Sequence, residues 1–251
     1  MSTSPVASPE APAGMSSFGR FVGVFLNPKA TFADIAQRPG WIVPVIVMTI
    51  IAVGLSAVLA NRANWKEIGR QQIENNSFAS RQFERLTPEQ REDALERSAK
   101  QALIMRYIRS FIGPVLLVVI VGGIYLGGFN ILGGARLRYK QALAIVSYAY
   151  MPLALRELIA IPVNAIKDPS GIDPENFLAS NAWAFLSNPP LWKAVFASWF
   201  DVFGLWALVL LALGFAAANP RKVSLGKAFG IVFGISFTLL LIFTGIASLF
   251  S

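Results

Sequence analysis

The sequence predicts an all-α integral membrane protein with five transmembrane helices and an N-terminal interfacial amphipathic helix. Of its 251 residues, 55% are hydrophobic and only 14% are charged, and the mean hydropathy is +0.55. Ordinary soluble domains carry about 25% charged residues. Several uncharged stretches also reach the roughly 20 residues that a helix needs to cross a hydrocarbon core of about 30 Å.

The composition excludes several classes of function. The chain has no His and no Cys, which removes the Ser-His-Asp and Cys-His nucleophile systems, the usual zinc and haem ligands, iron-sulfur clusters and disulfides. It also lacks a nucleotide-binding fingerprint and a plausible pair of catalytic carboxylates. We therefore expect no enzyme activity, no catalytic residue, no cofactor and no metal. The net charge of +8 indicates contacts with anionic lipid rather than with nucleic acid.

Residues 1–14 form the first predicted segment. They are small, polar and Pro-rich, and they lack the pattern of a signal peptide. Such a stretch cannot bury enough apolar surface to fold, so we expect a disordered tail. Met15 is a second candidate for the start of the protein.

Residues 15–40 should form interfacial helices. Phe18, Phe21 and Phe25 repeat at helical spacing and predict a helix whose aromatic face lies in the membrane surface. A second short helix should follow and end before Trp41, which is expected at the membrane interface. Packing of these aromatic side chains against the bundle is the alternative.

Residues 41–251 form the expected five-helix membrane domain. Three segments are uncharged over a full span, and two are interrupted by charges but remain apolar enough to cross. The predicted spans are residues 41–60, 110–135, 141–166, 194–219 and 228–251.

Two local signals refine this domain. In the extramembrane loop, residues 61–109, Thr87, Pro88 and Gln90 predict the start of a charged helix that runs into the second span. Pro152 should bend the third span because it lacks a backbone donor.

Basic residues in the short loops predict the orientation. The second and fourth loops are basic and belong in the cytoplasm, which places the N-terminus inside and the C-terminus outside. We expect this membrane to be a bacterial inner membrane. The first loop argues against this orientation, since ten basic residues lie between Arg62 and Arg109. The deciding residues are Arg136, Arg138, Lys140, Arg221, Lys222 and Lys227.

Arg156 and Asp201 are charged residues within predicted spans, where an unpaired charge costs a few kcal/mol. At about 1.5 Å per residue, they lie roughly 15 and 10 Å from the outer ends of their helices, so we expect them to meet. A structural ion pair and a site for a proton, an ion or a lipid headgroup are both compatible with this placement. The neighbouring Glu157 is expected to point elsewhere.

Small residues at a spacing of four indicate close helix packing, either within the chain or between two copies of it. The glycines concerned are Gly123, Gly127, Gly226, Gly230 and Gly234.

A family resemblance is carried by Gly133-Gly134, Gln141, Tyr148 and Pro152. Their order and spacing resemble the pattern of the Yip-one domain family, five-span membrane proteins related to Rab/Ypt-interacting factors. Residues 27–32 resemble the N-terminal signature of its bacterial branch, and residues 201–206, which end at Trp206, resemble its fourth span. The similarity extends over residues 18–250.

The resemblance implies a multispan fold with a cytoplasmic N-terminus. It does not imply a GTPase partner, because residues 109–114 replace the acidic and aromatic motif of the eukaryotic members. We expect a non-catalytic integral membrane scaffold or membrane-organising protein. Its partners should be the lipid bilayer and either other membrane proteins or a second copy of the chain.

The alternative function is a small transporter or channel that uses Arg156 and Asp201. A tightly packed bundle would favour the scaffold. A polar cavity lined by both residues would favour transport.

Overall fold

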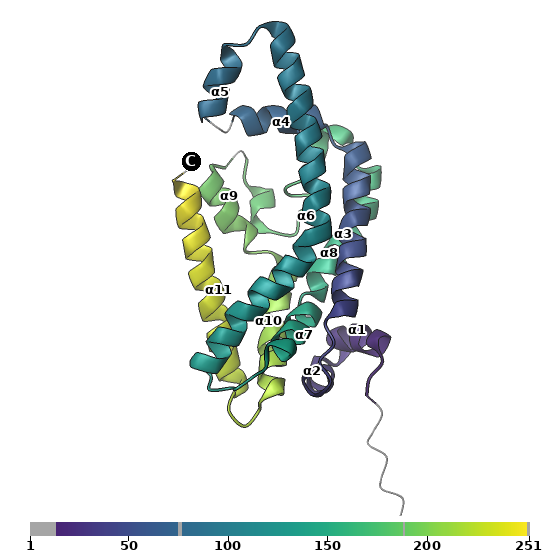
Figure 1. Cartoon of the computed structure of the whole chain (residues 1–251), viewed down its shortest axis with the longest axis vertical. Coiled ribbons are helices and arrows are strands. Elements are labelled where there is room, and N and C mark those ends of the chain that lie inside the picture. Colours follow the sequence, from purple (N-terminus) through teal and green to yellow (C-terminus); the bar gives the residue numbers. More distant parts are fainter. Residues whose placement is uncertain (1–13, 75–76, 188, 250–251) are drawn as a thin grey trace, which may run out of the picture.

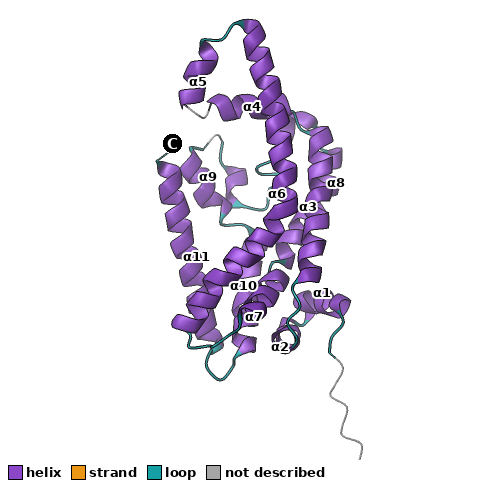
Figure 2. Cartoon of the chain, in the orientation of Figure 1, coloured by secondary structure: helices purple, strands orange, loops and turns teal. Residues whose placement is uncertain are grey.

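The computed structural model describes residues 14–74, 77–187 and 189–249. The predicted tail therefore lies outside the described residues, apart from Gly14. Within them the structure consists of helices and loops (Figure 2), and strand-like pairing is limited to an antiparallel bridge between Asn181 and Asp201. Four helical stretches are long and apolar enough to cross a membrane. The predicted all-α membrane fold is confirmed.

Two short helices, α1 (Ser17–Leu26) and α2 (Pro28–Gln37), form an N-terminal hairpin. Ser16 caps α1 by accepting a hydrogen bond from the backbone N–H of Gly19 at 3.0 Å. Pro28 begins α2, where its missing N–H costs nothing. Both helices lie at one end of the bundle (Figure 1).

The first long helix, α3 (Ile42–Arg62), leads to the opposite end of the bundle, where α4 (Trp65–Glu74) and α5 (Ser77–Glu84) lie (Figure 1). The next helix, α6 (Pro88–Ile131), is continuous over 44 residues. Thr87 and Gln90 form the capping box that begins it. At about 1.5 Å per residue α6 is roughly twice as long as a hydrocarbon core, so its first half projects beyond the spans.

The third predicted span consists of two helices, α7 (Tyr139–Ala149) and α8 (Met151–Ile166). They separate at Tyr150, two residues before Pro152. Pro152 has no N–H to donate to the carbonyl of Tyr148. The helix is therefore interrupted at the place that the proline predicts.

The fourth predicted span, residues 194–219, is not one continuous helix, and its crossing of the membrane stays a prediction. It is divided into α9 (Leu191–Ser198) and α10 (Val202–Ala218). Asp201 is not inside a helix but precedes α10 and caps it, accepting from the N–H of Gly204 at 2.8 Å. Between α8 and α9 the chain forms two short 3-10 turns, Pro169–Gly171 and Ala182–Phe185.

The last helix, α11 (Leu225–Ser248), begins with Ser224 as its cap. Figure 1 shows the chain passing between the two ends of the bundle as α3, α6, α7 with α8, α9 with α10, and α11. The path is the one expected of five spans, although α10 has only 17 residues. The number of membrane crossings stays a prediction.

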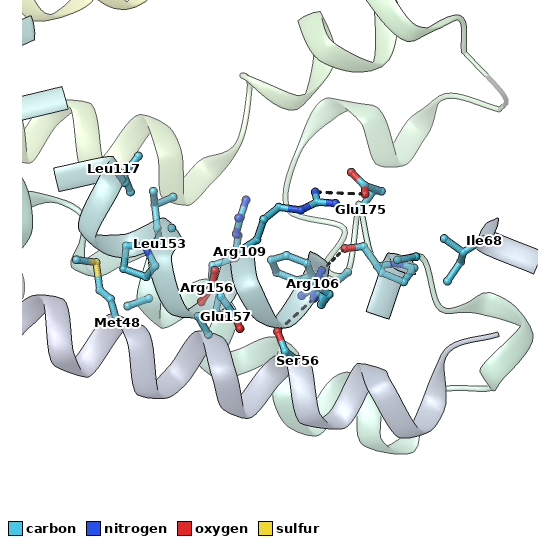
Figure 3. A pocket seen from close by; sticks show the side chains of 18 of the residues that line it. Met48, Ser56, Ile68, Arg106, Arg109, Leu117, Leu153, Arg156, Glu157 and Glu175 are labelled. Carbon is cyan, nitrogen blue, oxygen red and sulfur yellow. Dashed lines mark hydrogen bonds and ion pairs between the residues drawn. The ribbon is translucent and has the colours of Figure 1, made fainter. Parts of the chain in front are cut away.

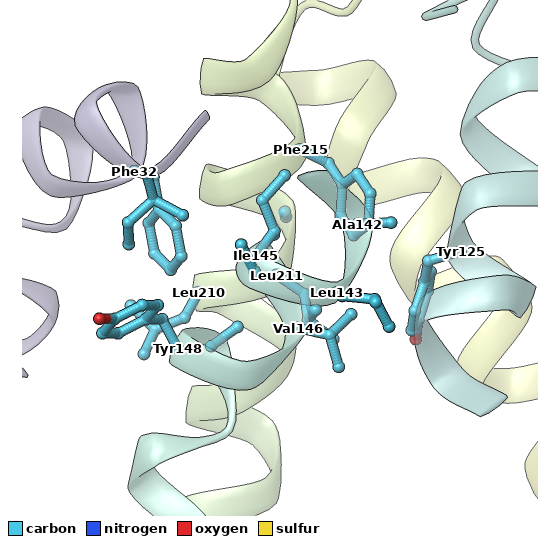
Figure 4. Packing of buried hydrophobic residues seen from close by; sticks show 14 of the residues in the cluster. Phe32, Tyr125, Ala142, Leu143, Ile145, Val146, Tyr148, Leu210, Leu211 and Phe215 are labelled. Carbon is cyan, nitrogen blue, oxygen red and sulfur yellow. The ribbon is translucent and has the colours of Figure 1, made fainter. Parts of the chain in front are cut away.

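The core surrounds α7, in which all eight residues from Ala142 to Ala149 are buried. Figure 4 shows its side chains between α2, α6 and α10. Phe129 and Phe215 stack with ring centroids 4.2 Å apart. The hydroxyls of Tyr125 and Ser236 are 2.8 Å apart and form a buried hydrogen bond. This half of the bundle is closely packed.

The predicted packing glycines do not make close contacts within the chain. A Cβ atom added at any of them would meet nothing within 4 Å. Close approach occurs instead at Gly122, Gly128 and Gly214. One residue turns a helix by about 100°, and the buried face of α6 contains Val118 and Gly122. Packing of these glycines against a second copy of the chain stays a prediction. They are Gly123, Gly127, Gly226, Gly230 and Gly234.

A matched pair of glycine substitutions tests this assignment. In Gly214→Ala the new Cβ would lie 2.6 Å from Ile145 and 2.9 Å from Phe32, so we expect a loss of about 1–3 kcal/mol in the free energy of unfolding in detergent. Gly230→Ala adds its methyl group in open space and should be neutral or stabilising by up to about 1 kcal/mol. Equal destabilisation by both substitutions would contradict the assignment.

Candidate functional site

Asp201 holds three parts of the bundle together. One carboxylate oxygen caps α10 through the N–H of Gly204, and the other accepts a hydrogen bond from the hydroxyl of Ser180. The backbone N–H of Val202 also donates to the carbonyl of Ser180 at 3.1 Å. The side chain of Asp201 is only 5% exposed. A carboxylate removed from water requires such partners.

Arg156, on α8, supplies the opposite charge. Its Nη1 atom lies 3.4 Å from Oδ2 of Asp201. The guanidinium carbon lies 4.9 Å from the centre of the Phe177 ring, in a cation–π arrangement. The buried Nε of Arg156 has no hydrogen-bond partner within the described residues. Arg156 thus attaches α8 to both α10 and the segment that precedes it.

A cavity of about 360 Å³ lies beside this pair, between α3, α6, α8 and the segment around Phe177 (Figure 3). Its lining includes Arg156 but not Asp201. Charged groups and apolar side chains therefore share one space. The further charged residues of the lining are Arg106, Arg109, Glu157 and Glu175.

Glu157 does not point away from this site, and that expectation is wrong. Although it is next to Arg156 in the sequence, Glu157 lines the same cavity. Successive residues of a helix are only about 100° apart, and a wide cavity beside α8 can contact both. Within the described residues Glu157 makes no hydrogen bond and no ion pair within 4 Å.

Arg106 is a site residue that the sequence analysis missed. Its Nη1 donates to the carbonyl of Pro174 at 2.7 Å and its Nε to the hydroxyl of Ser56 at 3.3 Å. It therefore connects α6 to α3 and to the segment between α8 and α9. One sequence signal could have identified it. Arg106 lies four residues before Ser110, on the same helix face, and that face continues into the second span.

The N-terminal hairpin presents a different apolar face from the predicted one. Phe18 is 76% exposed, whereas Phe21 and Phe25 pack against the bundle. Trp41 is also half-buried against the core. The exposed stripe instead consists of Met15, Phe18, Val22 and Leu26. We call these four residues the exposed stripe of α1.

An ion pair holds the two helices of the hairpin together, and two aromatic contacts fix the hairpin to the bundle. Arg20 of α1 pairs with Asp34 of α2 at 2.8 Å, with both side chains largely buried. The ring of Phe21 lies 5.6 Å from that of Tyr148, and the ring of Phe25 lies 5.3 Å from that of Trp206. The exposed stripe is therefore held at a fixed orientation relative to the spans.

Three residues of the family pattern contact the hairpin. Gln141 donates to the carbonyl of Ala36 at 3.0 Å, which joins α7 to α2. Tyr148 and Trp206 contact α1, while buried Pro152 lies in the first turn of α8. Gln141, Tyr148 and Trp206 therefore attach the hairpin to α7 and α10.

The remaining two pattern residues, Gly133 and Gly134, shape the loop between α6 and α7. A Cβ on Gly133 would lie 2.2 Å from the carbonyl oxygen of Phe129, and Gly134 has a positive φ of 64°. Lys227 donates to the carbonyl of Gly133 at 2.9 Å. The tight loop thus connects α6, α7 and α11.

Comparison with known families gives one match. The family model that is described as Yip1 domain matches residues 22–247 of the sequence. Neither the curated proteins nor the solved structures contain a match. The matched range includes the hairpin from Val22 onward, Arg156, Asp201 and all the residues of the family pattern.

Coupling between Arg156 and Asp201 can be measured by a double-mutant cycle in detergent. Asp201→Asn keeps an oxygen that can cap Gly204 and removes only the charge, and Arg156→Gln removes the opposite charge. We expect each substitution to lower the free energy of unfolding by about 1–3 kcal/mol, because it leaves the other charge partly buried and unpaired.

The double variant should recover much of this loss, since neither charge remains. If the two single effects simply add, the side chains are not coupled. Asp201→Ala serves as a comparison, because it also removes the cap and should be more destabilising than Asp201→Asn.

Proposed function

Because the chain belongs to the Yip1 domain family, we propose that it is a non-catalytic membrane scaffold or membrane-organising protein. The observation that carries this proposal is the exposed stripe of α1, attached rigidly to a membrane bundle. An amphipathic helix that lies in the interface acts on the lipids around it. Here the helix is fixed by its contacts to the spans and cannot leave the bundle independently.

The physical properties of the stripe favour membrane insertion. Phe18 and Leu26 are 76% and 80% exposed, and burial of such side chains is favourable at about 25 cal/mol per Å². Arg20, the basic residue of α1, is paired with Asp34 and turned toward the bundle. The outward face can therefore enter the acyl region without burying an unpaired charge.

The transporter alternative would need a polar path between the two ends of the bundle. The charged cavity adjoins α3, α6 and α8, and its lining on α6 and α8 reaches Leu117 and Leu153. Beyond it, Val118, Tyr125 and Phe129 are almost completely buried in the core. The packing favours the scaffold over transport.

We further propose that the protein lies in a bacterial inner membrane with its N-terminus inside and its C-terminus outside. The hairpin, the loop between α6 and α7 and the loop between α10 and α11 lie at the same end in Figure 1. The two loops carry short clusters of basic residues, which favours the cytoplasmic side. The C-terminal end of α11 lies at the opposite end (Figure 1).

The organising role can be tested in reconstituted vesicles. In Phe18→Ser with Leu26→Ser, the two most exposed side chains of the stripe become polar, so the hairpin should insert less deeply. Interfacial helices expand one leaflet and respond to curvature. The wild-type protein should therefore reduce the mean vesicle diameter as its density increases, and the double variant should not.

Lys29→Gln is the matched control, because Lys29 is exposed on α2 outside the stripe. It should behave like the wild type. Identical vesicle sizes for all three proteins, at equal incorporation, would refute the organising role of the stripe.

The orientation can be measured with single cysteines, because the natural chain has none. In intact bacterial cells, a membrane-impermeant maleimide should label Ser248→Cys at the end of α11. Arg221→Cys, in the loop between α10 and α11, should react only after lysis. The reverse pattern would show that the basic loop of residues 61–109 determines the orientation.

A further inference from the structure

The cavity beside α8 is amphipathic along its length. Arg106, Arg109 and Glu175 line one region, and Arg109 and Glu175 are 65% and 59% exposed at its surface. Met48 and Leu117 line another region together with further apolar side chains. A ligand that fits the cavity needs a charged part and an apolar part.

The spacing along α6 matches the depth profile of a lipid leaflet. Arg106 and Arg109 directly precede the uncharged segment that begins at Ser110, so they lie at headgroup level. Leu117 is eleven residues after Arg106, or about 16 Å along the helix axis, which is well inside the acyl region. The charged part of the cavity therefore lies at the depth of the lipid headgroups, and its apolar part lies at the depth of the acyl chains.

Within the described residues, two charged side chains of the lining make no ion pair within 4 Å, and a third leaves one buried nitrogen without a hydrogen bond. Within the described residues, Arg106 donates only to uncharged oxygens of Ser56 and Pro174. The Nε of Arg156 is buried without a hydrogen bond, and Glu157 makes no ion pair. Buried polar groups normally have partners, so the cavity offers both a cationic and an anionic contact to a ligand.

We propose that this cavity binds the headgroup of a zwitterionic phospholipid. Its phosphate accepts hydrogen bonds from Arg106, and its ammonium group faces Glu157. The glycerol and the first part of an acyl chain lie along Met48 and Leu117. A volume of about 360 Å³ is at the lower end of ligand sites, so it holds the head, and the acyl chains extend into the bilayer.

Charge balance favours a zwitterionic over an anionic head. Three arginines line the cavity, and two glutamates line it with them. The third negative charge is that of Asp201, which does not line the cavity but pairs with Arg156. A head with one phosphate and one ammonium group keeps this balance and contacts both Arg106 and Glu157, whereas an anionic head would add an uncompensated negative charge beside Glu157.

Native mass spectrometry of the full chain in detergent tests the proposal with defined probes. These are dioleoyl phosphatidylethanolamine, dioleoyl phosphatidylglycerol and water-soluble phosphoethanolamine. The wild type should retain one phosphatidylethanolamine about tenfold more tightly than either other probe. Arg106→Gln should weaken that retention about tenfold, because it removes the charge that meets the phosphate.

Glu157→Gln separates the two halves of the head. It should abolish the preference for phosphatidylethanolamine over phosphatidylglycerol. Glu157 makes no hydrogen bond or ion pair within the described residues, so this variant should fold. It therefore tests the site even if Arg106→Gln fails to fold. Arg221→Gln, at the opposite end of the bundle, is the control and should leave binding unchanged.

Three results would overturn the proposal. Unchanged retention of phosphatidylethanolamine in Arg106→Gln, together with an unchanged preference over phosphatidylglycerol in Glu157→Gln, would remove the site. Tighter binding of phosphatidylglycerol by the wild type would exclude a zwitterionic head. Equally tight binding of phosphoethanolamine would assign the cavity to a soluble phosphate ester rather than to a lipid.

Discussion

A helix that begins inside a membrane bundle leaves its first N–H groups without partners, and lipid cannot supply them. In this protein the break between α9 and α10 leaves such N–H groups at the start of α10. The carboxylate of Asp201 accepts from the N–H of Gly204, and the carbonyl of Ser180 accepts from that of Val202. The buried carboxylate then needs a positive charge, which Arg156 supplies at 3.4 Å. The carboxylate also accepts a hydrogen bond from Ser180. The residue that caps α10 therefore also holds α8 and the segment between α8 and α9 against it.

The cavity follows from the same arrangement. Ser180 is fixed to Asp201, and Phe177 lies against the guanidinium of Arg156. The preceding Pro174 accepts a hydrogen bond from Arg106 on α6. The segment that contains these residues is therefore held above α3, α6 and α8 at both of its ends, and it closes one side of a space lined by both charges and apolar groups (Figure 3).

The sequence predicted features that depend on composition and spacing along one helix. It identified the apolar segments, the start of α6 at Thr87 and the interruption of the helix near Pro152. Counting residues also placed Arg156 and Asp201 at similar depths. It did not identify the break before Asp201, because an Asp within an apolar stretch is compatible with both an intramembrane charge and a helix cap.

The sequence also did not predict which face of each helix contacts its neighbours. The spacing of Gly123 and Gly127 is compatible with packing, but it does not say which face meets a neighbour, and the face one residue away contains the contact. In α1 the predicted aromatic face included Phe21 and Phe25, which lie inward, and did not include Leu26, which lies outward. In a chain that is hydrophobic all round, burial against protein and exposure to lipid look alike in sequence.

Asp201 fixes both α10 and the segment that covers the cavity. Hydrogen–deuterium exchange on the Asp201→Ala variant in lipid nanodiscs measures this directly. Exchange should become faster than in the wild type both at residues 202–205, which lose their cap, and at residues 176–181, which lose their attachment, while α2 should be unchanged. Faster exchange confined to residues 202–205, or none at all, would contradict the account.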